Sequence, residues 1–201
     1  MHVTVWSDYI CPWAYLGRDR SDVLRSLGVD VVSRPYELHP ELPPEGRPTR
    51  PDGRLARVYD SIAAECSAVG MPFRAPSRTP NSRRALDTAE VVRAIAPDAF
   101  TTLDAALFAA HFVDGLDIGD ADVLDVLVRA AGVDAAEVRA RVERGEGHDA
   151  VTASVSAAHD HGIAATPAWL FGNDDAGFVL PGVQPRELFE RVVVRLRAQS
   201  E

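Results

Sequence analysis

The order of strand and helix patterns along the chain constrains its fold more than any other feature. Residues 2–6 form a short apolar strand pattern, and a helical apolar periodicity follows from residue 12 to about residue 27. Gly28 stands where a glycine commonly ends a helix, and residues 29–38 form a second strand pattern. The first 38 residues therefore predict a β-α-β unit, with a right-handed crossover helix if the two strands are parallel.

A proline-rich segment separates this unit from a long helical block. Residues 40–51 contain five prolines, which predicts a loop and the main boundary in the chain. From there to about residue 161 the pattern is helical almost throughout, with Asp120 and Asp134 at positions typical of helix N-caps. The predicted helices span residues 52–69, 80–95, 99–113, 120–131, 134–144 and 147–161.

The pattern returns to strands near the carboxyl end. Residues 168–171 and 178–180 are short strand patterns separated by a turn at 172–175, and residues 185–198 form a final amphipathic helix. A β-α-β half and a β-β-α half fit one α/β layer arrangement. We therefore predict one domain built from residues 1–50 and 162–201, with residues 51–161 as a helical insertion subdomain.

Charge and composition exclude several classes of function. The chain has 30 acidic and 21 basic residues, a net charge of −9, which disfavours a nucleic-acid or anionic-membrane partner. All the basic residues are arginines, so Schiff-base lysine chemistry and lysine-dependent phosphate loops are excluded. No apolar stretch is long enough to span a membrane, and Met1 is followed by no signal-peptide pattern. We expect a cytoplasmic protein.

Metal and disulfide frameworks are equally disfavoured. The two cysteines, Cys11 and Cys66, cannot form a disulfide scaffold for 201 residues, so a reducing compartment is expected. His159 and His161 are two residues apart at a predicted helix end, where their side chains would diverge by about 200°. We predict no metal site.

Cys11 lies where the first strand meets the first helix. It occupies the expected N-cap, and Pro12 occupies the first helical position, which favours proline. Free N–H groups and the helix dipole at that end favour an anion, so the sequence predicts a thiolate with a depressed pKa. The alternative is a buried, inert cysteine in a turn. Thr166-Pro167 precedes the third strand and by itself indicates only a special turn.

Several segments resemble one known family. Residues 7–17 (SDYICPWAYLG) resemble the active-site segment of DsbA-like thioredoxin-fold proteins of the FrnE-like branch, and residues 163–168 (IAATPA) resemble their cis-proline loop. Residues 182–185, 80–85 and 115–120 resemble further family segments, in the same order along nearly the whole chain. The 2-hydroxychromene-2-carboxylate isomerases and kappa-class glutathione transferases share this layout. In those relatives a serine usually replaces the cysteine, and glutathione is bound.

The chain departs from the resemblance at one important position. The second cysteine of the FrnE-like motif is replaced by Ala14, so a mixed disulfide on Cys11 cannot be resolved from within the motif. The resemblance then implies an external thiol, such as glutathione, mycothiol or another small thiol, and no tightly bound cofactor. Cys66 could substitute only if its Cα lies within about 4.4–6.8 Å of the Cα of Cys11.

The resemblance also implies a set of site residues around the nucleophile Cys11. The backbone at Thr166-Pro167 would face the sulfur and offer a strand edge to an extended thiol peptide. The helix start near Gln184 would bind a carboxylate, or Gln184 is only a solvated cap residue. Asn81 and Arg84 could face the site from the insertion. The alternative is that they belong to an ordinary helix start, with Thr79 as cap and Pro80 as the first helical residue. The residues predicted to bind substrate or thiol are Pro12, Trp13, Asn81, Arg84, Thr166, Pro167 and Gln184.

Three functions follow from this interpretation. The first is a thioredoxin-fold monothiol oxidoreductase that exchanges thiols and disulfides with a small external thiol. The second is a thiol-dependent isomerase or transferase acting on a small aromatic or electrophilic substrate. The third is a binding module without redox activity. The natural substrate is not specified by the sequence, nor is the oligomeric state, for which a homodimer is one option.

Overall fold

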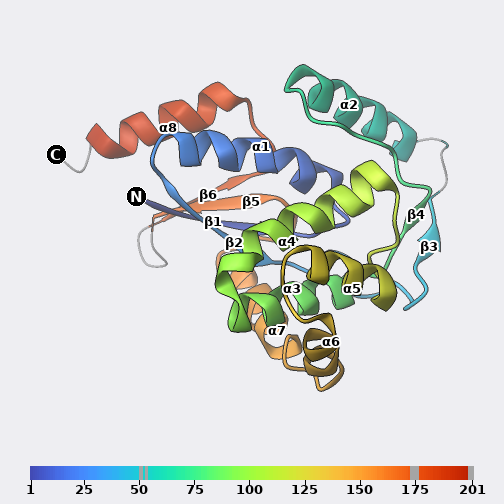
Figure 1. The fold of residues 1–201 in the computed structure, drawn as a ribbon. Coiled ribbons are helices and arrows are strands. Elements are labelled where there is room, and N and C mark those ends of the chain that lie inside the picture. Colours follow the sequence, from blue (N-terminus) through green and yellow to red (C-terminus); the bar gives the residue numbers. More distant parts are fainter. Residues whose placement is uncertain (50–51, 53, 173–176, 199–201) are drawn as a thin grey trace.

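Residues from both ends of the chain form one four-stranded sheet. The computed structural model describes residues 1–49, 52, 54–172 and 177–198. The strand order is β2-β1-β5-β6, with β1 parallel to β2, and with β5 antiparallel to both β1 and β6. The predicted α/β thioredoxin fold is therefore confirmed (Figure 1). The strands are β1 (His2–Ser7), β2 (Asp30–Pro35), β5 (Ala168–Phe171) and β6 (Phe178–Pro181).

Two helices cover one face of this sheet. Helix α1 (Pro12–Ser26) is the crossover between β1 and β2, and α8 (Arg186–Ala198) packs beside it (Figure 1). Alternate residues of a strand point to the same face, and the register pairs Val3 with Phe171 and Val5 with Trp169. These four side chains are buried together with residues of α1 and α8, which anchors both helices on the sheet.

The opposite face packs against α7 (His148–Asp160), the last helix before the second half of the sheet. Trp6 is buried there with Ala168 and Leu170, and its indole Nε1–H donates to the carbonyl oxygen of Ser154 at 3.2 Å. The sequence assigns α7 to the inserted block, yet the helix contacts the sheet directly. The proposed boundaries of the insertion, residues 51–161, remain a prediction.

The helices that follow β2 in the chain and precede α7 form a second cluster. The aspartates predicted as N-caps are confirmed, because Asp120 accepts from the N–H of Asp122 at 2.8 Å and Asp134 from that of Ala136 at 2.9 Å. The elements are α2 (Arg54–Ala68), α3 (Arg83–Ile95), α4 (Pro97–Ala109), the π-helical turn η1 (Ala110–Asp114), α5 (Ala121–Ala130) and α6 (Ala135–Glu143).

Two expectations for the segment before α3 are wrong. Strand β3 (Arg47–Pro48) lies in the segment 40–51 predicted to be loop, and it pairs with β4 (Arg78–Thr79), where no strand is predicted. A two-residue strand is too short to show a period in the sequence. Thr79 belongs to β4 and does not cap α3; Ser82 precedes the first helical residue, Arg83. Pro51 and the predicted turn residues 173–175 lie outside the described residues.

The larger hydrophobic core lies between α1 and the helical cluster. It includes Leu16 of α1, Ile62 of α2, Leu86 of α3 and Leu107 of α4, each no more than 1% exposed. This core positions the start of α1 against the insertion, where the candidate site is found. Among the described residues, no helix is long and apolar enough to cross a membrane.

Candidate active site

The local sequence builds the start of α1 around Cys11. Its backbone is extended, with φ −86° and ψ 113°, so it is the N-cap, and Pro12 is the first helical residue, as predicted. The N–H of Cys11 donates to the carbonyl oxygen of Asp8 at 3.0 Å, which closes a tight turn before the helix. The sulfur is therefore held at the amino end of α1, next to free N–H groups of its first turn.

The second half of the chain brings a proline loop onto this sulfur. The Thr166-Pro167 peptide bond is cis, as the resemblance implies. The thiol of Cys11 donates to the carbonyl oxygen of Thr166, with 3.3 Å between sulfur and oxygen. These residues are 155 positions apart in sequence, and the antiparallel pairing of β5 with β1 brings them together.

The expectation of a depressed pKa for Cys11 is wrong. Burial, with only 4% of the residue exposed, raises the pKa of the thiol above its usual value, and the nearby carboxyl of Asp8 raises it further. Contacts with the Thr166 side chain and with the N–H groups of Ala14 and Trp13 lower the pKa, but by less than burial raises it. The resting protein therefore holds a protonated thiol at neutral pH.

Asp8 is a buried carboxyl near Cys11 that the sequence did not indicate as part of the site. Its oxygens accept from the N–H of Ile10 at 3.2 Å, the N–H of Leu38 at 2.7 Å and the hydroxyl of Ser82 at 3.0 Å. Burial raises its pKa to about 6, against hydrogen bonds that lower it. An aspartate in the turn before a helix was the available signal, since such side chains commonly bond nearby backbone. Nothing in the sequence indicated its more distant partners, Leu38 and Ser82.

A second link joins the active-site turn to the insertion. The hydroxyl of Tyr9 donates to Oδ1 of Asp104 on α4 at 3.0 Å, and burial raises the pKa of both groups. The ring of Tyr9 also packs edge-on against Phe108, with 4.9 Å between the ring centroids. Through Asp8 and Tyr9, two residues of this turn contact α4 and the residue preceding α3, so the insertion fixes the position of the turn.

Comparison with known proteins agrees with this geometry. Residues 2–194 match the family described as DSBA-like thioredoxin domain. The chain belongs to the DSBA-like thioredoxin domain family. This family of thiol oxidoreductases and isomerases confirms the resemblance of the sequence motifs, is consistent with the FrnE-like branch, and makes the chain an enzyme of this class.

Solved structures extend the comparison. A probable DsbA oxidoreductase from Streptomyces coelicolor is 28% identical, with a TM-score of 0.83 over 97% of this chain and 89% of that chain. A 2-hydroxychromene-2-carboxylate isomerase has a TM-score of 0.79 at 15% identity, over 100% and 98% of the two chains. The cytosolic disulfide reductase DsbM from Pseudomonas aeruginosa has a TM-score of 0.71 at 20% identity, over 98% and 100%. The last two likenesses show the shared fold.

The position of the second motif cysteine is buried in this DsbA-like chain. Ala14 is 3% exposed and occupies the third helical position of α1, one turn beyond Cys11. The other cysteine, Cys66, is fully buried on α2, and burial raises its pKa to about 11. Both cysteines are free thiols. Neither position supplies a ready thiolate to Cys11.

The two residues proposed from the insertion have other partners. The amide Nδ2–H of Asn81 donates to the carbonyl oxygen of Leu42 at 2.7 Å, while its Oδ1 accepts from the N–H of Arg83 at 2.9 Å. Arg84 donates to the carbonyl oxygen of Gly119 at 3.3 Å, and it lines a cavity beside α5 and α6. In this structure the hydroxyl of Ser82, between them, reaches the active-site turn. A substrate-binding role for Asn81 and Arg84 stays a prediction.

The remaining predicted residues lie at or near the start of α1 and α8. Pro12 and Trp13 are half-buried in the first turn of α1, and Trp13 packs on the larger core. Gln184 lies two residues before α8; its side chain donates to the carbonyl oxygen of Pro181, and its own carbonyl accepts from Arg20 at 2.9 Å. Gln184 therefore organises the loop before α8, and its role toward a ligand stays a prediction.

The strand edge expected to bind an extended peptide is partly occupied. The carbonyl oxygen of Thr166 accepts from the Cys11 thiol, and that of Pro167 accepts from the N–H of Gly182 at 2.9 Å. The buried hydroxyl of Thr166 lies near enough to the Cys11 sulfur to lower the pKa of the thiol, and it has no other hydrogen-bond partner within the described part of the chain. A substrate at this edge would displace the thiol contact, and the hydroxyl could then donate to the sulfur as it ionises.

The histidines do not gather into a metal site. Within residues 1–49, 52, 54–172 and 177–198, no group of three or more potential ligands lies close enough to hold an ion. His159 bonds the hydroxyl of Tyr36 at 3.2 Å, whereas His161 lies against the ring of Trp6. The two side chains contact different aromatic rings, which fits their divergence on a helix end.

Proposed function

We propose that this protein is a monothiol thiol–disulfide oxidoreductase that works with an external low-molecular-weight thiol. The observation that carries the proposal is the placement of the Cys11 sulfur at the amino end of α1, 3.3 Å from the carbonyl oxygen of Thr166, with Ala14 where a second cysteine would stand. A sulfur held this way can attack a disulfide aligned along the loop before β5.

The proposed reaction takes two exchanges. The Cys11 thiol first loses its proton, and the thiolate attacks one sulfur of a disulfide R–S–S–R′. A bond forms between Cys11 and the R sulfur while R′S⁻ leaves and takes up a proton. A small external thiol then attacks the R sulfur, which releases the Cys11 thiolate and a new disulfide. Atoms and electrons balance without any bound cofactor.

Ionisation of Cys11 is the step that the site has to assist. Burial keeps the thiol protonated at rest, while the N–H groups of Trp13 and Ala14 favour the anion. A bound substrate displaces the thiol from the Thr166 carbonyl and leaves the Thr166 hydroxyl available as a donor to the sulfur. We therefore expect Cys11 to react fastest with disulfides that bind along this loop.

The co-substrate and the cellular setting are part of the same proposal. Glutathione, mycothiol or another small thiol supplies the second exchange, because fully buried Cys66 has a raised pKa and is a poor resolving thiol. We place the reaction in the reducing cytoplasm, with a small thiol and a disulfide as the only required partners. A homodimer is compatible with this scheme and is not needed for it.

A second candidate is a thiol-dependent isomerase or transferase. The specific observation in its favour is that Cys11 is a buried, protonated thiol at rest, which can donate a hydrogen bond to a bound cofactor thiolate. In that reaction Cys11 would orient the cofactor sulfur, and a small electrophilic substrate would be attacked by the cofactor. Cys11 would then form no disulfide.

Turnover of a small mixed disulfide separates these functions. With glutathione or mycothiol as the reductant, the wild-type protein and the Cys66→Ala variant should reduce the disulfide equally, and Cys11→Ser should be inactive. Isomerase or transferase turnover that survives in Cys11→Ser would overturn the oxidoreductase proposal in favour of the second candidate. An intact Cys11 that forms no adduct with any disulfide and supports no turnover would leave a binding module.

A further inference from the structure

A cleft runs beside α1 between the sheet and the insertion. Its volume is about 110 Å³, and its walls come from β1, β2, α1, α4 and the loop before β5. Ala14 and Pro167 form the end nearest the active site, while Arg18 and Arg25 lie farther along α1. The cleft shares Pro167 with the loop that contacts the Cys11 sulfur, and no step of the proposed reaction uses the rest of it.

The helical period places the cleft in line with Cys11. Positions 11, 14, 18 and 25 recur at spacings of three, four and seven residues, which share one face of an α-helix. Arg18 lies seven residues beyond Cys11, a rise of roughly 10 Å along the axis. Because helical side chains tilt toward the amino end, we expect the Arg18 guanidinium to extend back toward the active site.

Arg18 is the cation of this cleft that, among the described residues, has no carboxylate within ion-pair distance. Arg25 is paired with Asp22 at 2.9 Å. Asp104 accepts the Tyr9 hydroxyl, and within the described residues it makes no ion pair within 4.0 Å. Arg18 lies over the ring of Phe108, 5.7 Å from the centroid. Its charge also acts on the Asp104 carboxyl and partly offsets the rise that burial causes in the pKa of that carboxyl.

The surroundings of Arg18 suit a small anion. An aromatic ring beneath a guanidinium orients it and leaves its N–H groups free for a planar acceptor. The hydroxyl groups of Ser21 and Thr101 line the same cleft and can donate to a second oxygen. A carboxylate is planar, accepts two hydrogen bonds from one guanidinium, and is small enough for a cleft of about 110 Å³.

We propose that this cleft binds a carboxylate of the disulfide or thiol substrate, and that Arg18 is the residue that selects it. The inference rests on the proposed function, because it assigns the charge of the substrate that Cys11 attacks. The inference predicts that an anionic substrate reacts faster than a cationic one. The net charge of −9 on the whole molecule would by itself favour the cationic substrate. A preference for anions must therefore come from a local cation.

Three symmetric disulfides of similar size test the proposal: dithiodipropionate, which is anionic, hydroxyethyl disulfide, which is neutral, and cystamine, which is cationic. The rate of Cys11 adduct formation is followed by intact-protein mass spectrometry in a Cys66→Ala background. Dithiodipropionate should react about tenfold faster than the neutral probe, and Arg18→Gln should remove about that factor, as expected for one charge-assisted contact. The rate of adduct formation with the neutral probe should change less than about twofold in Arg18→Gln.

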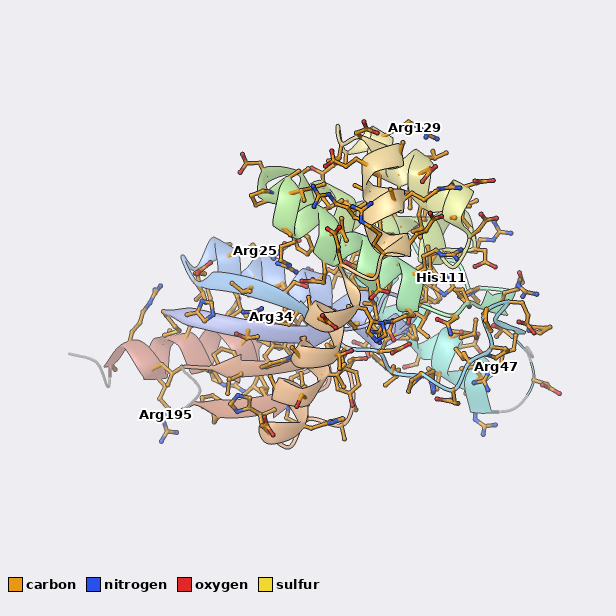
Figure 2. All side chains as sticks on the ribbon, turned by 90° about the horizontal axis from the view of Figure 1, so that it is seen from below. Arg25, Arg34, Arg47, His111, Arg129 and Arg195 are labelled. Carbon is orange, nitrogen blue, oxygen red and sulfur yellow. The ribbon has the colours of Figure 1, made fainter. Side chains whose placement is uncertain are left out.

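The matched control is Arg195→Gln, which removes the same charge from an exposed position on α8. Figure 2 shows Arg195 on α8, well apart from Arg25 on α1. The control should keep the preference for the anionic probe. Arg18→Lys should keep part of it, and thermal melting of each variant checks that it is folded.

The outcomes separate this inference from the proposed function. If Cys11 reacts with all three probes at rates that follow only the net charge, or if Arg195→Gln and Arg18→Gln act alike, the carboxylate site is wrong and the oxidoreductase stands. If Cys11 forms no adduct with any probe while Cys11 is intact, the proposed function itself fails. If the preference for the anionic probe is lost in Arg18→Gln and kept in Arg195→Gln, the result supports both the carboxylate site and the oxidoreductase function.

Discussion

The thiol of Cys11 donates a hydrogen bond to the carbonyl oxygen of Thr166 across 3.3 Å, a contact that only the protonated thiol can make. The helix N-terminus favours the thiolate, while burial favours the thiol, and burial is the larger effect here. Reactivity therefore depends on what replaces the Thr166 contact when a substrate enters.

Alkylation against pH measures the balance at Cys11 directly. In a Cys66→Ala background, the rate with iodoacetamide should be low at pH 7 and should still be rising above pH 9, because burial raises the pKa of the Cys11 thiol. A small model thiol is the reference. A midpoint below about 7.5, as found for activated cysteines, would show that the helix end outweighs burial.

Restoring the second cysteine tests the geometry of the helix start. Ala14 lines the cleft beside α1, so a sulfur on its Cβ has space, and the N-cap and third helical positions lie on the same side of the helix. Ala14→Cys should therefore form an internal disulfide with Cys11 under mild oxidation. Mass spectrometry of the peptide that carries both positions gives the readout, with Cys66→Ala present to exclude the alternative pairing.

If the Ala14→Cys peptide stays fully reduced under conditions that oxidise a model dithiol, the sulfurs point apart. The position of Cys11 described above would then be incorrect. Ala14→Ser is the matched control, since it adds a similar polar atom without redox chemistry.

Asp8 should give the folded protein a distinctive dependence on pH. Its pKa is about 6 in the folded chain and close to its usual 3.8 when unfolded, so the folded state holds an extra proton between these values. The free energy of unfolding should therefore fall as pH rises from about 3 to about 7, by about 3 kcal/mol in total from this group. Urea unfolding of wild type and Asp8→Asn at several pH values measures the difference.

Asp8→Asn should be less stable at pH 4.5, because it loses one acceptor for the N–H of Ile10 or of Leu38. The difference in the free energy of unfolding between Asp8→Asn and wild type should become smaller as pH rises toward 7. An exposed carboxyl on α2, Asp60, provides the control: Asp60→Asn should leave the pH dependence unchanged. A constant gap across pH would mean that Asp8 does not titrate in this range.

Gly17 allows the loop before β5 to approach α1. A Cβ at this position would lie 3.2 Å from Cγ of Pro167 and 3.2 Å from the ring of Trp169, both of which are held in place by close packing. Gly17→Val should therefore destabilise the fold by about 1–3 kcal/mol and slow the reaction of Cys11 with disulfides. Ala130→Val, at an exposed position of α5, should cost only a few tenths of a kcal/mol. Equal melting temperatures for the two variants would refute this contact.

The sequence alone determined the helices and strands around the four-stranded sheet and the candidate nucleophile. Apolar periodicity, Gly28 and the caps Asp120 and Asp134 act within a few residues, so the helices and strands of the sheet could be predicted from local pattern. The motif around Cys11 and Ala14 also specified which half of a dithiol pair is absent. None of these inferences required knowing which distant residues meet.

Tertiary structure decided the chemistry of the site. Local pattern predicted a depressed pKa for Cys11, because it shows the helix start and not the burial that opposes it. The partners of Asp8 and Tyr9 come from segments far along the chain, and their contacts exist only after the insertion packs on the active-site turn. Burial and long-range hydrogen bonds depend on the whole fold, so the charge state of the sulfur could not be read from its neighbours in sequence.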